Sequence, residues 1–158
     1  MSKIPVIVIF APTASGKTAL MYDLFSCEGS QFFLNGKAEI ISADSMQVYK
    51  KLDIGTAKPD KEFCKKIPHH LIDLFDYKTQ VSVADFVNLA DEKVSEINAR
   101  GKIPVVAGGT GFYIRSFLLG LPSTPESDDK IRNELKERIK NEGKEKLYSE
   151  LLKKDPES

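Results

Sequence analysis

The stretch VIVIFAPTASGKTAL, residues 6–20, constrains the fold of this chain more than any other part of it. It opens with a continuous run of apolar, largely β-branched residues, which is typical of a strand buried on both faces of a parallel sheet. A loop ending in Gly16-Lys17-Thr18 follows, and directly after it comes a helical pattern with apolar residues on one side: Ala19, Leu20, Leu24 and Phe25. A buried strand that passes through such a loop into a helix predicts an α/β fold.

Strand-like and helix-like patterns alternate over the rest of the first 122 residues. Helical spacing covers 83–100, with Gly101 as a stop signal, and 111–119, which Gly120 ends. The strand-like runs are IPVIVIF at 4–10, AEIIS at 38–42, HHLIDLF at 69–75 and KIPVVAGG at 102–109. This alternation predicts a doubly wound parallel sheet of the P-loop NTPase type.

The composition changes after this core, and we predict two parts: an α/β core over 1–122 and the start of a helical insertion over 123–158. The second part has the pattern of two charged amphipathic helices. Between 130 and 154 there are nine Lys/Arg and five Glu, an excess of four positive charges (9 − 5). Such a face suits a few contacts to phosphates of RNA. Its apolar positions are Ile131, Leu135, Ile139, Leu147, Leu151 and Leu152.

The overall composition excludes several classes of protein. The chain has 158 residues, 41% of them hydrophobic, and a formal net charge of zero. A neutral protein has no overall field that attracts nucleic acid or an anionic membrane, so any RNA binding must be local. Cys27 and Cys64 have no metal-ligand spacing, and no apolar run is long enough to cross a bilayer. We therefore expect a cytoplasmic protein with no membrane partner.

Residues 11–18, APTASGKT, match the phosphate-loop pattern GxxxxGK followed by Ser or Thr, except at the first position. In this pattern, backbone N–H groups and a helix N-terminus bind phosphate, the lysine adds positive charge and the hydroxyl residue binds Mg²⁺. Ala11 replaces the first glycine, which costs about 1 kcal/mol or more if the backbone there needs a positive φ. An ordinary strand-to-helix turn is the alternative. The predicted phosphate-binding residues are Ala11, Pro12, Thr13, Ala14, Ser15, Gly16, Lys17 and Thr18, with Thr18 as the Mg²⁺ ligand.

A phosphate loop alone does not identify the reaction. A kinase or an ATPase usually adds a strand that ends in an aspartate for the Mg²⁺ shell. The best candidate strand, IPVVAGGT, ends in glycines, whereas Asp44 and Asp73 follow weaker candidates. The pattern therefore favours a reaction other than hydrolysis of ATP, and a P-loop kinase, an ATPase or a non-catalytic nucleotide-binding remnant are the alternatives.

Several stretches together closely resemble the tRNA dimethylallyltransferases. They are PTASGKT, ISADSMQVYKKLDIGTAKP, PHHLIDLFD, SVADF and IPVVAGGTGFYIRSFLLGL, and the resemblance runs from residue 4 to 158. It implies that the loop holds the diphosphate of dimethylallyl diphosphate, with Mg²⁺. The five-carbon group would pass to N6 of the adenosine beside the anticodon, in tRNAs that read codons beginning with U. The diphosphate would leave, its growing charge stabilised by the loop.

The resemblance also implies roles for single residues. Asp44 would take the proton from N6, while Thr13 and Lys17 would act on the diphosphate. Spacing alone also allows Asp44 and Gln47 to form a helix capping box, and both roles could coexist. The residues implied to contact tRNA are Asp44, Ser45, Met46, Gln47, Thr110 and Arg132.

Two pairs of adjacent residues have simple structural interpretations. His69 and His70 point to opposite faces of a strand and cannot share a metal, so we predict structural roles for both. Gly108 and Gly109 allow either a close approach of substrate to the backbone or a strand-to-helix turn.

The chain departs from the family pattern in two respects. The connection between Thr18 and Asp44 is several residues longer than expected for the bacterial enzymes, which a surface loop accommodates at low cost. Family members are also roughly twice as long, so we expect an N-terminal portion with an incomplete core, weak diphosphate binding and little turnover. We expect a monomer. The related alternative is an adenylate isopentenyltransferase, which prenylates free nucleotides and would not need the basic helical pair.

Overall fold

The computed structural model describes residues 3–26, 34–121 and 128–157. The chain divides into two compact units, Met1–Leu121 and Pro122–Ser158. Cys27 and much of the long connection that precedes Asp44 lie outside the described residues.

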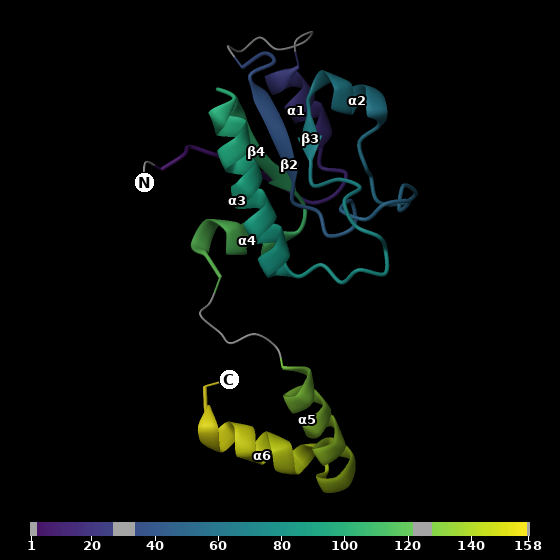
Figure 1. The fold of residues 1–158 in the computed structure, drawn as a ribbon, viewed down its shortest axis with the longest axis vertical. Coiled ribbons are helices and arrows are strands. Elements are labelled where there is room, and N and C mark those ends of the chain that lie inside the picture. Colours follow the sequence, from purple (N-terminus) through teal and green to yellow (C-terminus); the bar gives the residue numbers. More distant parts are fainter. Residues whose placement is uncertain (1–2, 27–33, 122–127, 158) are drawn as a thin grey trace. The chain divides into compact units, whose positions relative to one another are not determined.

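The first unit is a parallel sheet with helices on both faces (Figure 1). Among the described residues, the strand order is β1-β4-β2-β3. Every pairing is parallel, so the carboxyl ends of the strands meet at one edge of the sheet. The predicted α/β fold is confirmed. Its elements are β1 (Ile7–Phe10), α1 (Lys17–Phe25), β2 (Ala38–Ser42), α2 (Lys61–Lys66), β3 (His69–His70), α3 (Val83–Ala99), β4 (Ile103–Gly108) and α4 (Gly111–Leu119).

Apolar side chains cover both faces of this sheet. α3 crosses one face, with α4 beside it (Figure 1), and Tyr113 of α4 stacks on Phe86 of α3 with ring centroids 4.5 Å apart. On the other face, Met21 and Phe25 of α1 pack with Ile40 of β2. β2 and β4 contribute to both clusters, and all their residues except Ile103 are buried, as expected for strands that are covered on both faces.

Helix α3 follows its sequence pattern closely. It begins at a capping box, in which the Ser82 side chain accepts from Asp85 N while Asp85 accepts from Ser82 N. It ends just before Gly101, which has a φ of +70°. Its buried side chains recur at the predicted helical spacing; they are Phe86, Val87, Ala90, Val94 and Ile97.

Two sequence-based expectations about local structure were wrong. Most of the apolar run at 69–75 is not strand, because Leu71 and Asp73 take left-handed backbone angles, φ +61° and +55°. The apolar side of α1 also differs from the expected one, since Leu20 is 47% exposed and Met21 is buried instead. A helix of nine residues has too few positions for its buried face to be assigned reliably from spacing.

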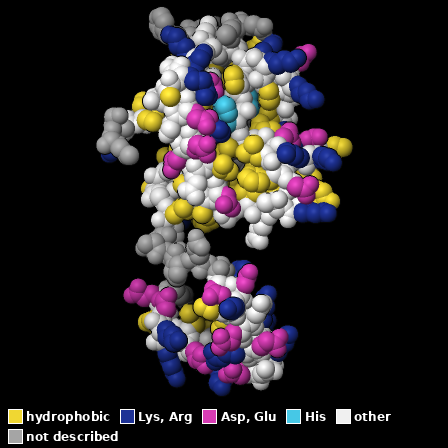
Figure 2. All heavy atoms as spheres, viewed as in Figure 1, with side chains coloured by type: hydrophobic (Ala, Val, Ile, Leu, Met, Phe, Trp, Pro, Cys, Tyr) yellow, Lys and Arg dark blue, Asp and Glu magenta, His cyan; other side chains and the backbone are white. Residues whose placement is uncertain are grey.

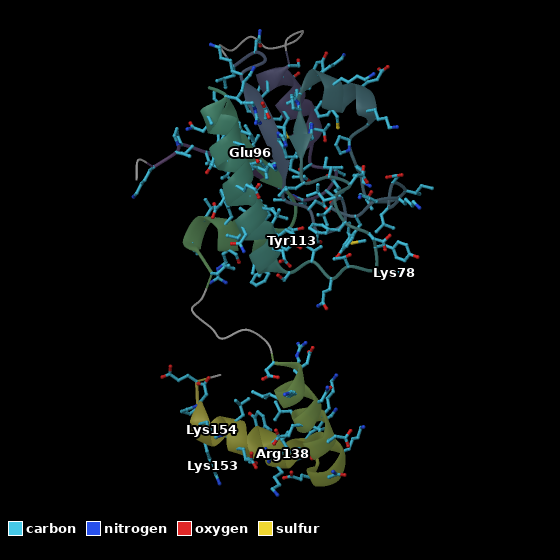
Figure 3. All side chains as sticks on the ribbon, viewed as in Figure 1. Lys78, Glu96, Tyr113, Arg138, Lys153 and Lys154 are labelled. Atoms are coloured by element: carbon cyan, nitrogen blue, oxygen red, sulfur yellow. The ribbon has the colours of Figure 1, made fainter. Side chains whose placement is uncertain are left out.

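The second unit consists of α5 (Asp129–Glu142) and α6 (Lys144–Lys154), joined at Gly143. Arg138 links the two helices (Figure 3): it lies 2.8 Å from a Glu142 oxygen and 2.7 Å from one of Glu150. The hydrogen bond from Arg138 lowers the pKa of Glu142 to about 2, helped by Lys146. The apolar stripe of this unit is partly exposed, with Ile131 at 56%.

The visible surface of both units carries positive and negative side chains interspersed (Figure 2), as the zero net charge suggests. Within the described part of the chain, no helix combines the length and apolarity needed to cross a bilayer.

Candidate active site

The loop between β1 and α1 has the backbone shape of an anion-binding site. Ala14 and Gly16 take positive φ angles, 62° and 88°, whereas Ala11 does not. The alanine that replaces the first glycine of the pattern therefore causes no backbone strain at that position. Ser15 Oγ donates to the carbonyl of Pro12 at 2.7 Å, which closes the loop on itself. At its end, the first N–H groups of α1 have no intrahelical partners and favour an anion.

Lys17 is anchored over this loop. Its Nζ donates to the carbonyl oxygens of Ala11 at 2.7 Å and Pro12 at 2.6 Å. The positive charge thus lies beside the N-terminus of α1, where two sources of positive potential add.

The second wall of the site comes from the turn that follows β2. Asp44 Oδ1 accepts from the backbone N–H groups of Met46 at 2.9 Å and Gln47 at 3.2 Å. Residues 45–48 form a turn and no helix begins there, so the capping-box alternative was wrong. The Gln47 side chain does not accept from the Asp44 backbone N–H, as a capping box requires. It accepts from Ser42 Oγ at 2.9 Å and donates to the carbonyl of Ala57 at 3.0 Å.

The loop after β4 holds this turn in place. Thr110 Oγ1 accepts from Ser45 N at 3.1 Å, and Thr110 N donates to the carbonyl of Ala43 at 3.2 Å. A Cβ on Gly108 would stand 2.1 Å from that same carbonyl oxygen. The close approach that needs a glycine here is therefore made by the chain's own backbone.

A cavity of about 450 Å³ opens between these loops. It brings together seven residues of the predicted site, while Ala11, Pro12, Ser15, Ser45, Met46 and Thr110 are near it in the chain but do not line it. The seven are Thr13, Ala14, Gly16, Lys17, Thr18, Asp44 and Gln47.

The cavity also has apolar walls that sequence patterns did not reveal. Ile40 belongs to a strand pattern that indicates core, Met21 was not expected on the buried side of α1, and Phe63 belongs to a six-residue helix with no clear pattern. His69 lines the cavity too. Its Nδ1 lies 2.6 Å from the carbonyl oxygen of Ile67, and burial lowers its pKa, so this wall is uncharged at neutral pH. His70 instead contacts Glu39, as expected for neighbours on opposite faces.

The cavity contains oxygen donors that suit Mg²⁺ shared with a phosphate. No cluster of three or more His, Cys, Asp or Glu side chains able to hold a metal occurs within the described residues. Mg²⁺ commonly binds through one or two protein groups, water and phosphate oxygens. The Thr18 hydroxyl, which lines the cavity at the N-terminus of α1, fits that arrangement.

Two other predicted candidates lie elsewhere. Asp73 is not among the cavity-lining residues, and its carboxylate lies 2.7 Å from Lys58 Nζ, which also contacts Asp53 at 2.7 Å. Arg132 is exposed on α5 in the second unit. Asp44 is thus the carboxylate that shares a cavity with the phosphate loop.

Comparison with known families identifies the group to which this arrangement belongs. The model of the family described as IPP transferase matches residues 47–158. This chain belongs to the IPP transferase family. The matched part includes Gln47, the cavity walls on α2 and β3, and the second unit.

Three bacterial relatives of this chain carry the name tRNA dimethylallyltransferase. Proteins named tRNA dimethylallyltransferase from Geobacter metallireducens and Bacillus subtilis are each 43% identical to this chain, over 98% and 99% of it. One from Aquifex aeolicus is 46% identical over 96% of the chain. The matches cover 47%, 48% and 47% of those proteins, so this IPP transferase chain spans about half their length. The resemblance inferred from the sequence is confirmed.

Solved structures agree with the fold. The full-length tRNA isopentenylpyrophosphate transferase of Bacillus halodurans is 38% identical with a TM-score of 0.65, covering 98% of this chain and 49% of that one. A eukaryotic dimethylallyltransferase acting on tRNA is 30% identical with a TM-score of 0.74, covering 96% of this chain and 36% of that one.

Proposed function

We propose that this chain carries the donor site and the catalytic carboxylate of a tRNA dimethylallyltransferase. The observation that supports this most strongly is the single cavity in which a phosphate loop, the Asp44 carboxylate and an apolar floor meet. A nucleotide hydrolase needs the first two features but has no use for an apolar floor next to the phosphates. A donor with a diphosphate head and a short hydrocarbon tail uses all three.

The loop binds and stabilises the diphosphate. Lys17 exchanges its bonds to the Ala11 and Pro12 carbonyls for phosphate oxygens, and the α1 N–H groups and the Thr13 hydroxyl donate as well. Thr18 would hold Mg²⁺, whose charge would stabilise the leaving diphosphate. As the allylic C–O bond breaks, its electron pair goes to the diphosphate, and these groups balance the growing negative charge.

Asp44 acts on the acceptor. The lone pair of adenine N6 forms the new C–N bond, and the N6 proton passes to the carboxylate. Asp44 Oδ1 already accepts two backbone N–H groups, which fix its orientation and leave Oδ2 for N6. The turn 44–47, Thr110 and Arg132 would contact the tRNA, and the protein would act as a cytoplasmic monomer.

Transfer of label tests the proposal. The chain is incubated with Mg²⁺, labelled dimethylallyl diphosphate and an anticodon stem-loop that carries the adenosine. We expect slow formation of N6-dimethylallyladenosine, and a further loss of about 100-fold or more in Asp44→Asn, as for removal of a general base. Asp53→Asn, which changes an exposed carboxylate outside the cavity, serves as the matched control.

Acceptors and cosubstrates separate the alternatives. Transfer to AMP in preference to the stem-loop would indicate an adenylate isopentenyltransferase. Hydrolysis of ATP, or phosphoryl transfer from it, without prenyl transfer would indicate a kinase or an ATPase. Saturable donor binding without transfer would restrict the function of this chain to binding.

A further inference from the structure

The cavity continues past the phosphate loop towards the middle of the sheet. β1 and β2 point the same way, so α1 must run back from the carboxyl edge towards the amino edge. Met21 lies four residues after Lys17, about 6 Å further along the helix. Ile40 lies two residues before Ser42, about 7 Å back along the strand. Both steps lead away from the mouth of the cavity, so Met21 and Ile40 form its floor.

Two of the side chains that form the floor are apolar and almost fully buried. Met21 is 7% exposed and Ile40 1% exposed. Phe63 of α2 completes the floor, and its ring centroid lies 6.2 Å from that of Tyr22 and 5.2 Å from that of His69. These ring contacts restrict the movement of the Phe63 side chain, because turning it away would break them.

We propose that Met21, Ile40 and Phe63 hold the hydrocarbon tail of the allylic diphosphate, and that Phe63 limits the tail to one five-carbon unit. This inference rests on the proposed function. A diphosphate fixed at the loop directs its tail along α1 towards the floor, where removal of apolar surface from water favours binding. A ten-carbon tail would meet the Phe63 ring, which packed side chains hold in place.

A series of diphosphates tests this assignment. Inorganic diphosphate, dimethylallyl diphosphate and the ten-carbon geranyl diphosphate are titrated calorimetrically into the wild-type chain, Phe63→Ala and Phe63→Leu. We expect the wild type to prefer the five-carbon over the ten-carbon ester by about 10-fold or more, because steric exclusion from a closed pocket gives discrimination of that order. Phe63→Ala should remove most of this preference and Phe63→Leu part of it, while affinity for inorganic diphosphate changes less than about twofold.

Two further variants make the test specific. Phe63→Trp enlarges the ring and should weaken binding of dimethylallyl diphosphate while leaving inorganic diphosphate unaffected. Phe112→Ala removes the same kind of ring from α4, where it is 62% exposed and outside the cavity, and should change nothing. If Phe63→Ala fails to fold, as seen by circular dichroism, the Leu and Trp variants decide the question.

The outcomes separate this inference from the proposed function. An unchanged five-to-ten-carbon preference in the Phe63 variants, with dimethylallyl diphosphate still preferred over inorganic diphosphate, would overturn the inference alone. Weaker binding of adenosine in these variants with an unchanged preference would also overturn it, because the floor would then be the acceptor site. Equal affinity of the wild type for dimethylallyl and inorganic diphosphate would contradict both.

Discussion

Gly108 lies against the backbone of Ala43, at the edge of the sheet where the cavity opens. A Cβ there would stand 2.1 Å from Ala43 O and 2.5 Å from Ala43 C. Ala43 is held on both sides, since its N–H donates to the Ala107 carbonyl at 2.8 Å and its carbonyl accepts from Thr110. We expect Gly108→Ala to lower the free energy of unfolding by about 2–4 kcal/mol, measured by urea denaturation, because neither strand can yield freely.

Gly109 is the matched control for this substitution. A Cβ on Gly109 would first meet Ala11 O at 3.6 Å, which is ordinary van der Waals contact. Gly109→Ala should therefore stay within about 1 kcal/mol of the wild type. Equal losses in the two variants would show that the close approach at Gly108 has been assigned wrongly.

Glu39 is a buried acid of the first unit, with a side chain 10% exposed. Burial alone would raise its pKa, but hydrogen bonds from Arg100 at 2.7 Å and His70 at 2.7 Å outweigh it and hold the pKa below its ordinary value of 4.5. A lowered pKa in the folded state contributes stability above about pH 4.5, and this contribution is lost as the pH falls through the lowered value.

We therefore expect Glu39→Gln to cost about 1–3 kcal/mol at pH 7, since a hydrogen-bonded charge is lost. The difference from the wild type should shrink as the pH falls below about 4.5, measured by urea denaturation at several pH values. The exposed Glu92→Gln on α3 should change stability by less than about 0.5 kcal/mol. A pH-independent difference for Glu39→Gln would refute the linkage.

Among the helices, α3 depends on the cap at its first turn. Ser82 Oγ accepts from Asp85 N at 3.1 Å, and Asp85 Oδ2 accepts from Ser82 N at 2.8 Å. Ser82→Ala should lower the free energy of unfolding of the first unit by about 1 kcal/mol, measured by thermal denaturation. Ser95→Ala, at an exposed mid-helix position of α3 where Ser95 Oγ bonds the Asp91 carbonyl, should be neutral or slightly stabilising. A loss at Ser95 as large as at Ser82 would contradict the capping role.

The sequence predicted best those elements whose structure is determined by residues within one segment of the chain. β1, β2, β4 and α3 followed their patterns because periodic burial and end signals operate within one segment. β3 was overestimated, because the chain leaves the strand at Leu71 and Asp73, which take left-handed angles, and Asp73 N then donates to the Gln47 carbonyl in the turn that follows β2. The phosphate loop was found from its pattern, whereas Phe63 enters the cavity through tertiary packing that no local pattern encodes.

At the scale of the whole molecule, the cavity that we propose as the donor site is lined by described residues of the first unit. Every residue that lines the cavity lies between Thr13 and Gly109. The basic helices with Arg132 form a separate compact unit. Binding of the donor should therefore depend on residues of the first unit, whatever the acceptor requires.

The most direct test compares the affinities of the cavity for dimethylallyl diphosphate and for ATP. Dimethylallyl diphosphate and ATP are titrated calorimetrically, with Mg²⁺, into the wild-type chain, Lys17→Ala and the control Lys93→Ala, whose lysine lies on α3 and pairs with Glu96. We predict that the allylic diphosphate binds more tightly than ATP, that Lys17→Ala weakens it by about 10-fold or more, and that Lys93→Ala does not. Tighter binding of ATP, or an allylic diphosphate affinity insensitive to Lys17→Ala, would contradict the assignment of this cavity to a prenyl donor.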